Sequence, residues 1–208
     1  MENKHGTNID STIAFYNENA EAFVETTRNA DVKTLYSPFE QLINPGCSIL
    51  DLGCGSGRDS KYFSDKGYKV ISIDASEVMC KKTREITNNP VYLMRAEDLL
   101  YYEEFDAVWA CASLLHISKS DMYETLQKVL DSLKKGGIMY ASWKYGKDER
   151  LSGGRYFSDY TEKSLRGIFS RFSYVSIKKL WITEDVLPEK KDEKWLNILI
   201  EKCMKVSN

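Results

Sequence analysis

Short apolar runs alternate with amphipathic segments over most of this 208-residue chain. Runs typical of buried strands occupy 49–52, 69–74, 90–94, 105–110 and 138–143. Between them, apolar residues at helical spacing or a capping serine predict helices at 58–66, from Ser76 onward and at 120–133, with a turn at 134–137. Strands that alternate with helices form mainly parallel sheets with helices on both faces. The pattern therefore predicts an α/β fold.

Both ends of the chain depart from this alternation. Before the first strand, apolar residues at helical spacing predict one helix over 11–27 and a second over 31–42. At the other end, 172–183 and 195–203 are typical of strands, and only a short polar segment joins them. A parallel pair needs a crossover of about a dozen residues or more. These two strands are therefore expected to form an antiparallel hairpin.

Composition and charge narrow the class of protein. The net charge is −2, the pI is about 5.8 and the basic residues are scattered, so nucleic acid and anionic membranes are not expected partners. No apolar run approaches the ~20 residues that cross a bilayer, and the polar start lacks a signal-peptide core, so we expect a cytoplasmic protein. Five cysteines without a CxxC pair fit reduced thiols, and His5 and His116 are too far apart in sequence to suggest a metal site.

The most informative chemical signal is a glycine-rich turn that directly follows the first strand. Gly53, Gly55 and Gly57 permit positive φ and close approach of a ligand to the backbone. Asp74 ends the second strand, and in a βαβ unit the first turn and the end of the second strand lie side by side. Asp74 is therefore expected to accept hydrogen bonds from a ribose held by the loop.

The glycine spacing argues against a dinucleotide. Its Gly-x-Gly-x-x-Gly fingerprint needs a third glycine, which would fall at Arg58 or Ser60. The segment Asp51-Leu-Gly-Cys-Gly-Ser-Gly57, followed by Asp74, instead resembles the S-adenosylmethionine (SAM) loop of class I methyltransferases. The resemblance implies a Rossmann-like, seven-stranded, mostly parallel sheet with helices on both faces, a C-terminal antiparallel hairpin strand and an N-terminal helical lid. It also implies SAM as cofactor and S-adenosylhomocysteine as product.

A chain of this length is within the range that one hydrophobic core supports. With the resemblance, this predicts a single methyltransferase domain over 1–208. Its expected parts are an N-terminal helical cap over 1–45, a SAM-binding core over 46–144, and a final part over 145–208. That final part would hold a substrate loop, a helix and the C-terminal hairpin.

The resemblance further implies contacts with the cofactor. The backbone of Gly53, Cys54 and Gly55 is expected at the carboxypropyl and ribose parts, and Asp74 at the ribose hydroxyls. Tyr16 resembles a tyrosine that many small methyltransferases fold over the cofactor carboxylate. For Tyr16, packing of an aromatic ring on an amphipathic helix is the alternative.

Other implied contacts lie around the adenine and beneath the methionine end, at Ala75, Ser76, Met79, Ala96, Glu97, Asp98 and Cys111. Arg58 and Asp59 begin the helix after the loop, where a contact with the cofactor and a purely capping role are equal alternatives. Purely structural roles are the alternative for several of these residues. Asp59 could instead stabilise the positive end of a helix, and Met79 could simply pack on a helix face. Glu97 could belong to an exposed pair of charged residues. Among the acidic residues after the third strand, Glu97 is the preferred contact for the adenine amino group.

Candidate catalytic residues follow the fourth and fifth strands. His116 has an ordinary pKa that suits a general base, although a structural histidine is an equal alternative. Gly153 and Gly154 permit hinge-like backbone states, and Arg155 and Tyr156 offer a planar donor and an aromatic surface. This stretch resembles small bacterial methyltransferases related to tellurite-resistance enzymes, and it is interpreted as a substrate lid. A mobile charged loop is the alternative.

The function predicted from these features is SAM-dependent methyl transfer to a small or medium polar molecule, with a nitrogen, oxygen, sulfur or chalcogen nucleophile. Catalysis by alignment leaves few diagnostic side chains, so the acceptor stays open. Alternatives are a tRNA or protein methyltransferase and a non-catalytic SAM-binding regulator. The expected partner is a small-molecule substrate, and the expected assembly is a monomer or a homodimer.

Overall fold

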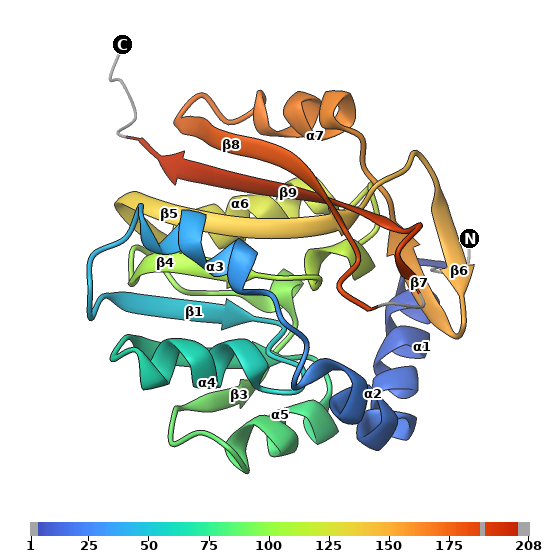
Figure 1. Ribbon diagram of the computed structural model, residues 1–208. Coiled ribbons are helices and arrows are strands. Elements are labelled where there is room, and N and C mark those ends of the chain that lie inside the picture. Colours follow the sequence, from blue (N-terminus) through green and yellow to red (C-terminus); the bar gives the residue numbers. More distant parts are fainter. Residues whose placement is uncertain (1–3, 188–189, 204–208) are drawn as a thin grey trace.

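The centre of the protein is a seven-stranded sheet in the order β3-β2-β1-β4-β5-β9-β8, seen in a computed structural model that describes residues 4–187 and 190–203 (Figure 1). Its strands are β1 Ser48–Leu52, β2 Lys69–Asp74, β3 Val91–Leu93, β4 Phe105–Ala110, β5 Leu133–Lys144, β8 Val175–Glu184 and β9 Lys194–Lys202. The first five of these pair in parallel, and β9 runs antiparallel to both β5 and β8. The predicted sheet and its antiparallel C-terminal hairpin are confirmed.

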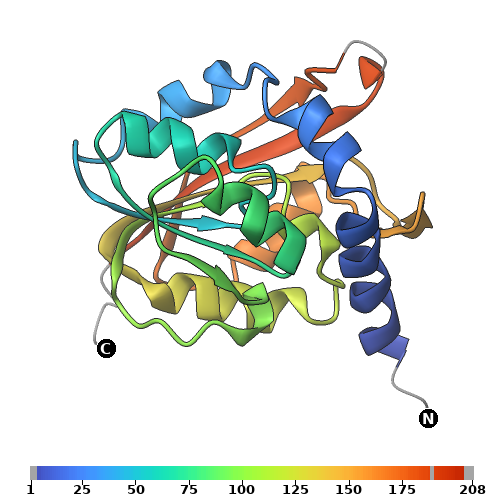
Figure 2. The ribbon, with the colours of Figure 1, turned by 90° about the horizontal axis from the view of Figure 1, so that it is seen from below.

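Helices cover both faces of this sheet, and Figure 2 shows the two layers. On one face α3 (Lys33–Glu40) and α4 (Arg58–Asp65) pack on a cluster that contains Ile49. On the other face α6 (Met122–Ser132) and α7 (Glu162–Phe169) pack on a cluster that contains Leu50. Successive side chains of β1 point to opposite faces of the sheet, and both faces are buried. This is why the sequence of a parallel strand is a continuous apolar run. Within the described ranges, no helix is long and apolar enough to cross a membrane.

The N-terminal segment forms two helices, so the prediction of one helix over 11–27 was wrong. Helix α1 covers Lys4–Glu18 and α2 covers Ala20–Thr27. At the break, the side-chain amide of Asn19 donates to the carbonyl oxygen of Phe15 at 2.8 Å, and the backbone N–H of Asn19 donates to the same oxygen at 2.9 Å. Asparagine competes with the backbone in this way and favours helix ends.

The segment interpreted as a substrate loop is a β-hairpin. Strand β6 (Glu149–Ser152) pairs antiparallel with β7 (Arg155–Ser158), and Gly153 and Gly154 form the two-residue turn with φ of 55° and 79°. Positive φ at both positions is what a two-residue hairpin turn with the twist of its strands requires. The hairpin packs against α1 (Figure 1).

The predicted turn at 134–137 lies inside β5, which begins at Leu133. The pairing with β4 changes register there, from Phe105 opposite Leu133 to Ala107 opposite Ile138. Extra residues that interrupt a ladder are accommodated by a bulge, and glycine at positive φ is typical of one. The glycines therefore mark an irregularity within a strand and not its beginning.

Candidate active site

The carboxyl ends of β1, β2 and β4 open on a cavity of about 850 Å³. Helix α1, the β6–β7 hairpin and the ends of β5, β8 and β9 supply its other walls. Most of the residues singled out from the sequence line it, namely Tyr16, Gly53, Cys54, Gly55, Arg58, Asp59, Asp74, Ala75, Ser76, Met79, Ala96, Glu97, Cys111, His116 and Arg155. Segments far apart in the sequence thus meet at the edge where ligands of open α/β sheets bind.

Two residues of the predicted set are not among those that line the cavity. Asp98 is exposed in the short 3₁₀ helix η1 (Ala96–Asp98). The Tyr156 hydroxyl donates to the Glu149 carboxylate across the hairpin. Burial, and to a smaller extent this hydrogen bond, raises the pKa of Tyr156 to about 12. Strand alternation explains the position of Tyr156, because its neighbours Arg155 and Phe157 face the cavity.

The glycine loop turns sharply against two neighbouring strands. The backbone N–H groups of Gly53 and Cys54 donate to the Ile73 carbonyl oxygen at 2.8 and 2.9 Å. Gly53, Gly55 and Gly57 have φ of 80°, 52° and 77°. A Cβ atom on Gly53 would lie 2.3 Å from the Cβ atom of Ser113, a separation that no side chain tolerates. Glycine at 53 therefore lets the loop contact the segment after β4.

Asp74 holds the loop from the end of β2. Its two carboxylate oxygens accept the backbone N–H of Gly55 at 2.9 Å and of Ser76 at 2.8 Å. Burial raises the pKa of Asp74, and these N–H donors oppose that rise. The Ala75 backbone N–H also acts on this carboxylate. A carboxylate offers about four acceptor sites, so Asp74 keeps acceptor capacity for a ligand. Ser76 also caps α5 (Glu77–Arg84), accepting the Met79 N–H at 3.1 Å as predicted.

Arg58 and Asp59 pair with each other behind the loop. The Arg58 guanidinium donates to both Asp59 oxygens at 2.6 and 2.9 Å. The Asp59 carboxylate also accepts from the Tyr36 hydroxyl at 2.5 Å and from the Trp109 indole at 2.8 Å. Burial opposes ionisation of Asp59, but Arg58 outweighs it and lowers the pKa of Asp59. With these partners, Asp59 is a buried anchor between α3, α4 and β4.

His116 and Tyr16 form one hydrogen-bonded unit. His116 lies in the 3₁₀ helix η2 (Leu114–His116); its Nδ1 is 2.6 Å from the Tyr156 carbonyl oxygen, and its Nε2 is 2.9 Å from the Tyr16 hydroxyl. A carbonyl only accepts, so Nδ1 carries the hydrogen and Nε2 accepts from Tyr16. Burial lowers the pKa of His116 to about 4. The occupied lone pair and the low pKa favour the structural alternative over a general base.

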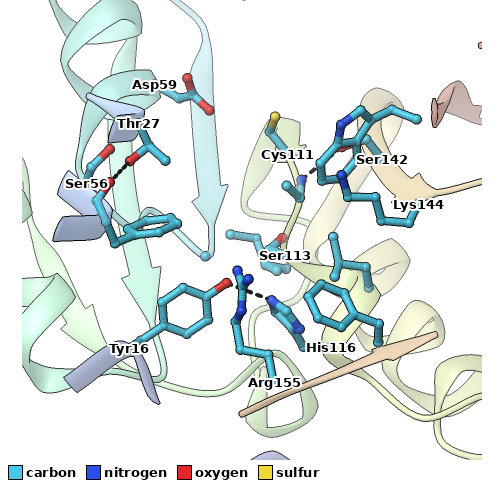
Figure 3. A pocket seen from close by; sticks show the side chains of 18 of the residues that line it. Tyr16, Thr27, Ser56, Asp59, Cys111, Ser113, His116, Ser142, Lys144 and Arg155 are labelled. Atoms are coloured by element: carbon cyan, nitrogen blue, oxygen red, sulfur yellow. Dashed lines mark hydrogen bonds between the residues drawn. The ribbon is translucent and has the colours of Figure 1, made fainter. Parts of the chain in front are cut away.

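Helix α1 spans the cavity and contacts both of its sides. On one side, the Ser76 hydroxyl donates to the Asn17 side-chain oxygen at 2.7 Å. On the other side, the backbone N–H of Tyr156 donates to the Thr12 hydroxyl at 2.9 Å. In Figure 3, Tyr16 and Arg155 lie next to each other, with Arg155 pointing into the cavity between Tyr16 and His116. The helix and the hairpin together form a roof.

Sequence reasoning missed the far wall of the cavity. Polar side chains there include Ser142 and Lys144 at the end of β5 and Asn197 on β9 (Figure 3 shows the first two). The Lys144 ammonium donates to Asp185 at 2.9 Å and lies 3.9 Å from the centre of the Trp195 ring. Lys144 ends a parallel strand, which was an available signal. Asn197 and Trp195 come from the antiparallel hairpin of β8 and β9, and no local pattern marks them.

Comparison with known proteins supports a family assignment for the core. Residues 49–137 match the family model of a methyltransferase domain. An uncharacterized methyltransferase of Synechocystis sp. is 34% identical over 104 residues, 49% of this chain and 49% of its own. A carboxy-S-adenosyl-L-methionine synthase of Vibrio vulnificus is 26% identical over 123 residues, 54% of this chain and 50% of its own. The chain thus spans about half the length of these curated relatives.

A solved structure agrees over a larger part of the chain. The 1,6-didemethyltoxoflavin N1-methyltransferase of Burkholderia thailandensis, with bound 1,6-didemethyltoxoflavin and S-adenosylhomocysteine, superposes with a TM-score of 0.78. It covers 96% of this chain and 91% of its own at 17% identity, so the match establishes the fold. The domain match over residues 49–137 and the fold together support a class I SAM-dependent methyltransferase.

Proposed function

We propose that this protein transfers the methyl group of SAM to a small or medium polar acceptor. The supporting observation is one cavity with two chemically different sides. The glycine loop and Asp74 form the first side, and Ser142, Lys144 and Asn197 contribute to the second. A cofactor on the first side and an acceptor on the second would share one enclosure. Cavities of this size are typical of small-molecule sites.

Two features of the first side fit the cofactor. Gly53 and Gly55 have positive φ and line the cavity without side chains, so a ligand can lie against main-chain atoms there. Asp74 keeps acceptor capacity beyond its backbone bonds, which suits the hydroxyls of a ribose. Met79 and Glu97 line the cavity beyond Asp74, where we place the adenine.

Bound SAM supplies a methyl group already activated on a sulfonium. The protein then has to align the acceptor with that methyl group and exclude water. Helix α1 and the β6–β7 hairpin cover the cavity and serve the second purpose. His116 holds the Tyr16 hydroxyl in place, and an acceptor whose nucleophile carries no proton needs no base. Polar side chains on the second side suit a nitrogen, oxygen, sulfur or chalcogen nucleophile.

The test is turnover with methyl-labelled SAM and three classes of acceptor, namely small polar molecules, tRNA and a protein extract. Our proposal predicts S-adenosylhomocysteine formation and label in a small molecule, and both are lost in Asp74→Ala. Label found only in RNA or protein would favour the corresponding macromolecular methyltransferase. Cofactor binding without turnover in any pool would indicate a regulator.

A further inference from the structure

Arg155 is a cavity arginine for which no carboxylate partner occurs in the part of the chain that the structure describes. The other arginines of the lining each pair with a carboxylate, as Arg58–Asp59, Arg95–Asp10 and Arg150–Asp159. The Nε atom of Arg155 is buried and has no hydrogen-bond partner among the described residues. A buried polar group without a partner is costly, so such an arrangement points to a ligand that completes it.

Aromatic rings fix the direction of this guanidinium. Its central carbon lies 4.7 Å from the centre of the Phe15 ring, 5.2 Å from that of Phe157 and 5.9 Å from that of Tyr16. Contacts of this kind hold the flat guanidinium in place, with the Tyr16 hydroxyl beside it. Arg155 therefore presents a preorganised guanidinium whose Nε donor is unused, and a carboxylate is the group that a guanidinium edge matches.

A second unused donor lies on the wall formed after β4. The Ser113 hydroxyl oxygen is buried and, within the described chain, has no hydrogen-bond partner. Ser113 touches the glycine loop, since a Cβ atom on Gly53 would lie 3.2 Å from its hydroxyl oxygen. Both Ser113 and Arg155 line the same cavity as the loop.

The strand order gives the direction in which an extended cofactor would run. Asp74 ends β2, Gly53 follows β1 and Ser113 follows β4, and these strands are neighbours in that order. A ribose at Asp74 and a thioether at Gly53 therefore direct the amino-acid end toward Ser113 and Arg155.

We propose that Arg155, assisted by the Ser113 hydroxyl, binds the carboxylate at the methionine end of the cofactor. This rests on the proposed function. It means that the β6–β7 hairpin, which with α1 forms the roof of the cavity, is tied to the cofactor itself. The bound cofactor then completes the wall against which the acceptor lies.

The experiment compares two ligands that differ in this carboxylate. S-adenosylhomocysteine carries the amino-acid group, whereas 5′-methylthioadenosine has the same adenosine and thioether without it. Calorimetric affinities are measured for the wild type, Arg155→Met and Arg155→Lys. The control is Arg166→Met, at an exposed arginine of α7 that does not line the cavity. Arg155→Met should weaken the binding of S-adenosylhomocysteine roughly 10- to 100-fold and leave the binding of methylthioadenosine unchanged. The affinity of Arg155→Lys for S-adenosylhomocysteine should lie between those of the wild type and Arg155→Met, and Arg166→Met should keep the wild-type ratio of the two affinities.

An unchanged ratio in Arg155→Met would overturn the proposal, whether both ligands weaken or neither does. Methylthioadenosine binding reports that each variant is folded. If Arg155→Met does not fold, Arg155→Lys provides the test. Weaker binding of S-adenosylhomocysteine alone supports the proposal, and equal weakening of both ligands overturns it. A wild type that binds neither ligand would instead contradict the proposed function.

Discussion

At the scale of single residues, Asp74 connects the loop to the proposed ribose site. Asp74→Ala removes the acceptor for two ribose hydroxyls, so S-adenosylhomocysteine affinity should fall about 10-fold or more. Titration calorimetry measures this, with the unfolding temperature recorded alongside because the variant also loses the bonds to Gly55 and Ser76. The control is Asp65→Ala, an exposed carboxylate that pairs with Lys61 at the end of α4. Near-unchanged affinity in Asp74→Ala would remove the ribose assignment.

His116 links the active site to the pH dependence of stability. Folded His116 stays neutral down to about pH 4, whereas the unfolded side chain takes up a proton near pH 6.5. The unfolded state therefore binds more protons in this window, and stability falls as the pH is lowered from 6.5 to 4. Urea unfolding at about pH 7.5 and about pH 5 should show an additional loss of about 2 kcal/mol in the wild type relative to His116→Gln.

The same variant separates two roles of His116. If it acts as a general base, His116→Gln abolishes turnover and removes the acidic limb of the pH–rate profile. If it positions Tyr16, turnover falls moderately, the profile keeps its shape, and Tyr16→Phe produces the same defect. In the unfolding experiment, an equal loss of stability on acidification in the wild type and in His116→Gln would contradict a buried neutral histidine.

At this scale the position of the loop beside Asp74 could be predicted, and the polar side chains on the opposite side of the cavity could not. Asp74 and the glycines are close in sequence, and their spacing identifies a loop beside a strand end. Tyr16 and His116 are 100 positions apart, and only the fold brings their side chains together. Arg58 illustrates a further limit, because no spacing indicates that its guanidinium is occupied by Asp59.

At the scale of elements, the glycine loop depends on contact as well as on conformation. In Gly53→Ala the new Cβ atom meets Ser113 at 2.3 Å, and the position has a φ of 80°. The matched control is Gly67→Ala, which has a φ of 87° and nothing within 4 Å of the new atom. The control should lose about 1 kcal/mol of unfolding free energy from backbone strain, and Gly53→Ala about 1–3 kcal/mol more from the clash.

Gly53→Ala should also weaken the binding of S-adenosylhomocysteine, because the loop must shift away from Ser113. Gly67→Ala should bind S-adenosylhomocysteine with the wild-type affinity. Chemical denaturation and calorimetry on the two variants check both statements. Equal stability and equal affinity in the two proteins would show that the contact between the loop and the segment after β4 is unimportant.

Elements were predictable where burial dictates the pattern. Strands β2 and β4 begin and end at the expected residues because parallel strands are buried on both faces. The β6–β7 hairpin was missed because Glu149, Leu151 and Ser152 are exposed and give no apolar run. The Gly153–Gly154 pair was the available signal for it. At the break, the Asn19 side chain donates to the Phe15 carbonyl oxygen, a contact that helical periodicity does not register.

At the scale of the whole molecule, sheet order follows from chain connectivity more readily than the shape of the cavity does. Alternating strands and helices and a short final connection already indicate a parallel sheet with an antiparallel end. The cavity needs α1, the β6–β7 hairpin and the ends of β8 and β9 to meet over the sheet. These contacts are long-range, and they decide which acceptor fits.

The central claim is that the cavity binds an adenosyl cofactor of the methyltransferase family. Calorimetric titration of the purified protein with SAM, S-adenosylhomocysteine and NADH tests it most directly. The account predicts saturable binding of the first two at one site per chain and no binding of NADH. Binding of NADH in preference to SAM, or no binding of any of the three, would contradict it.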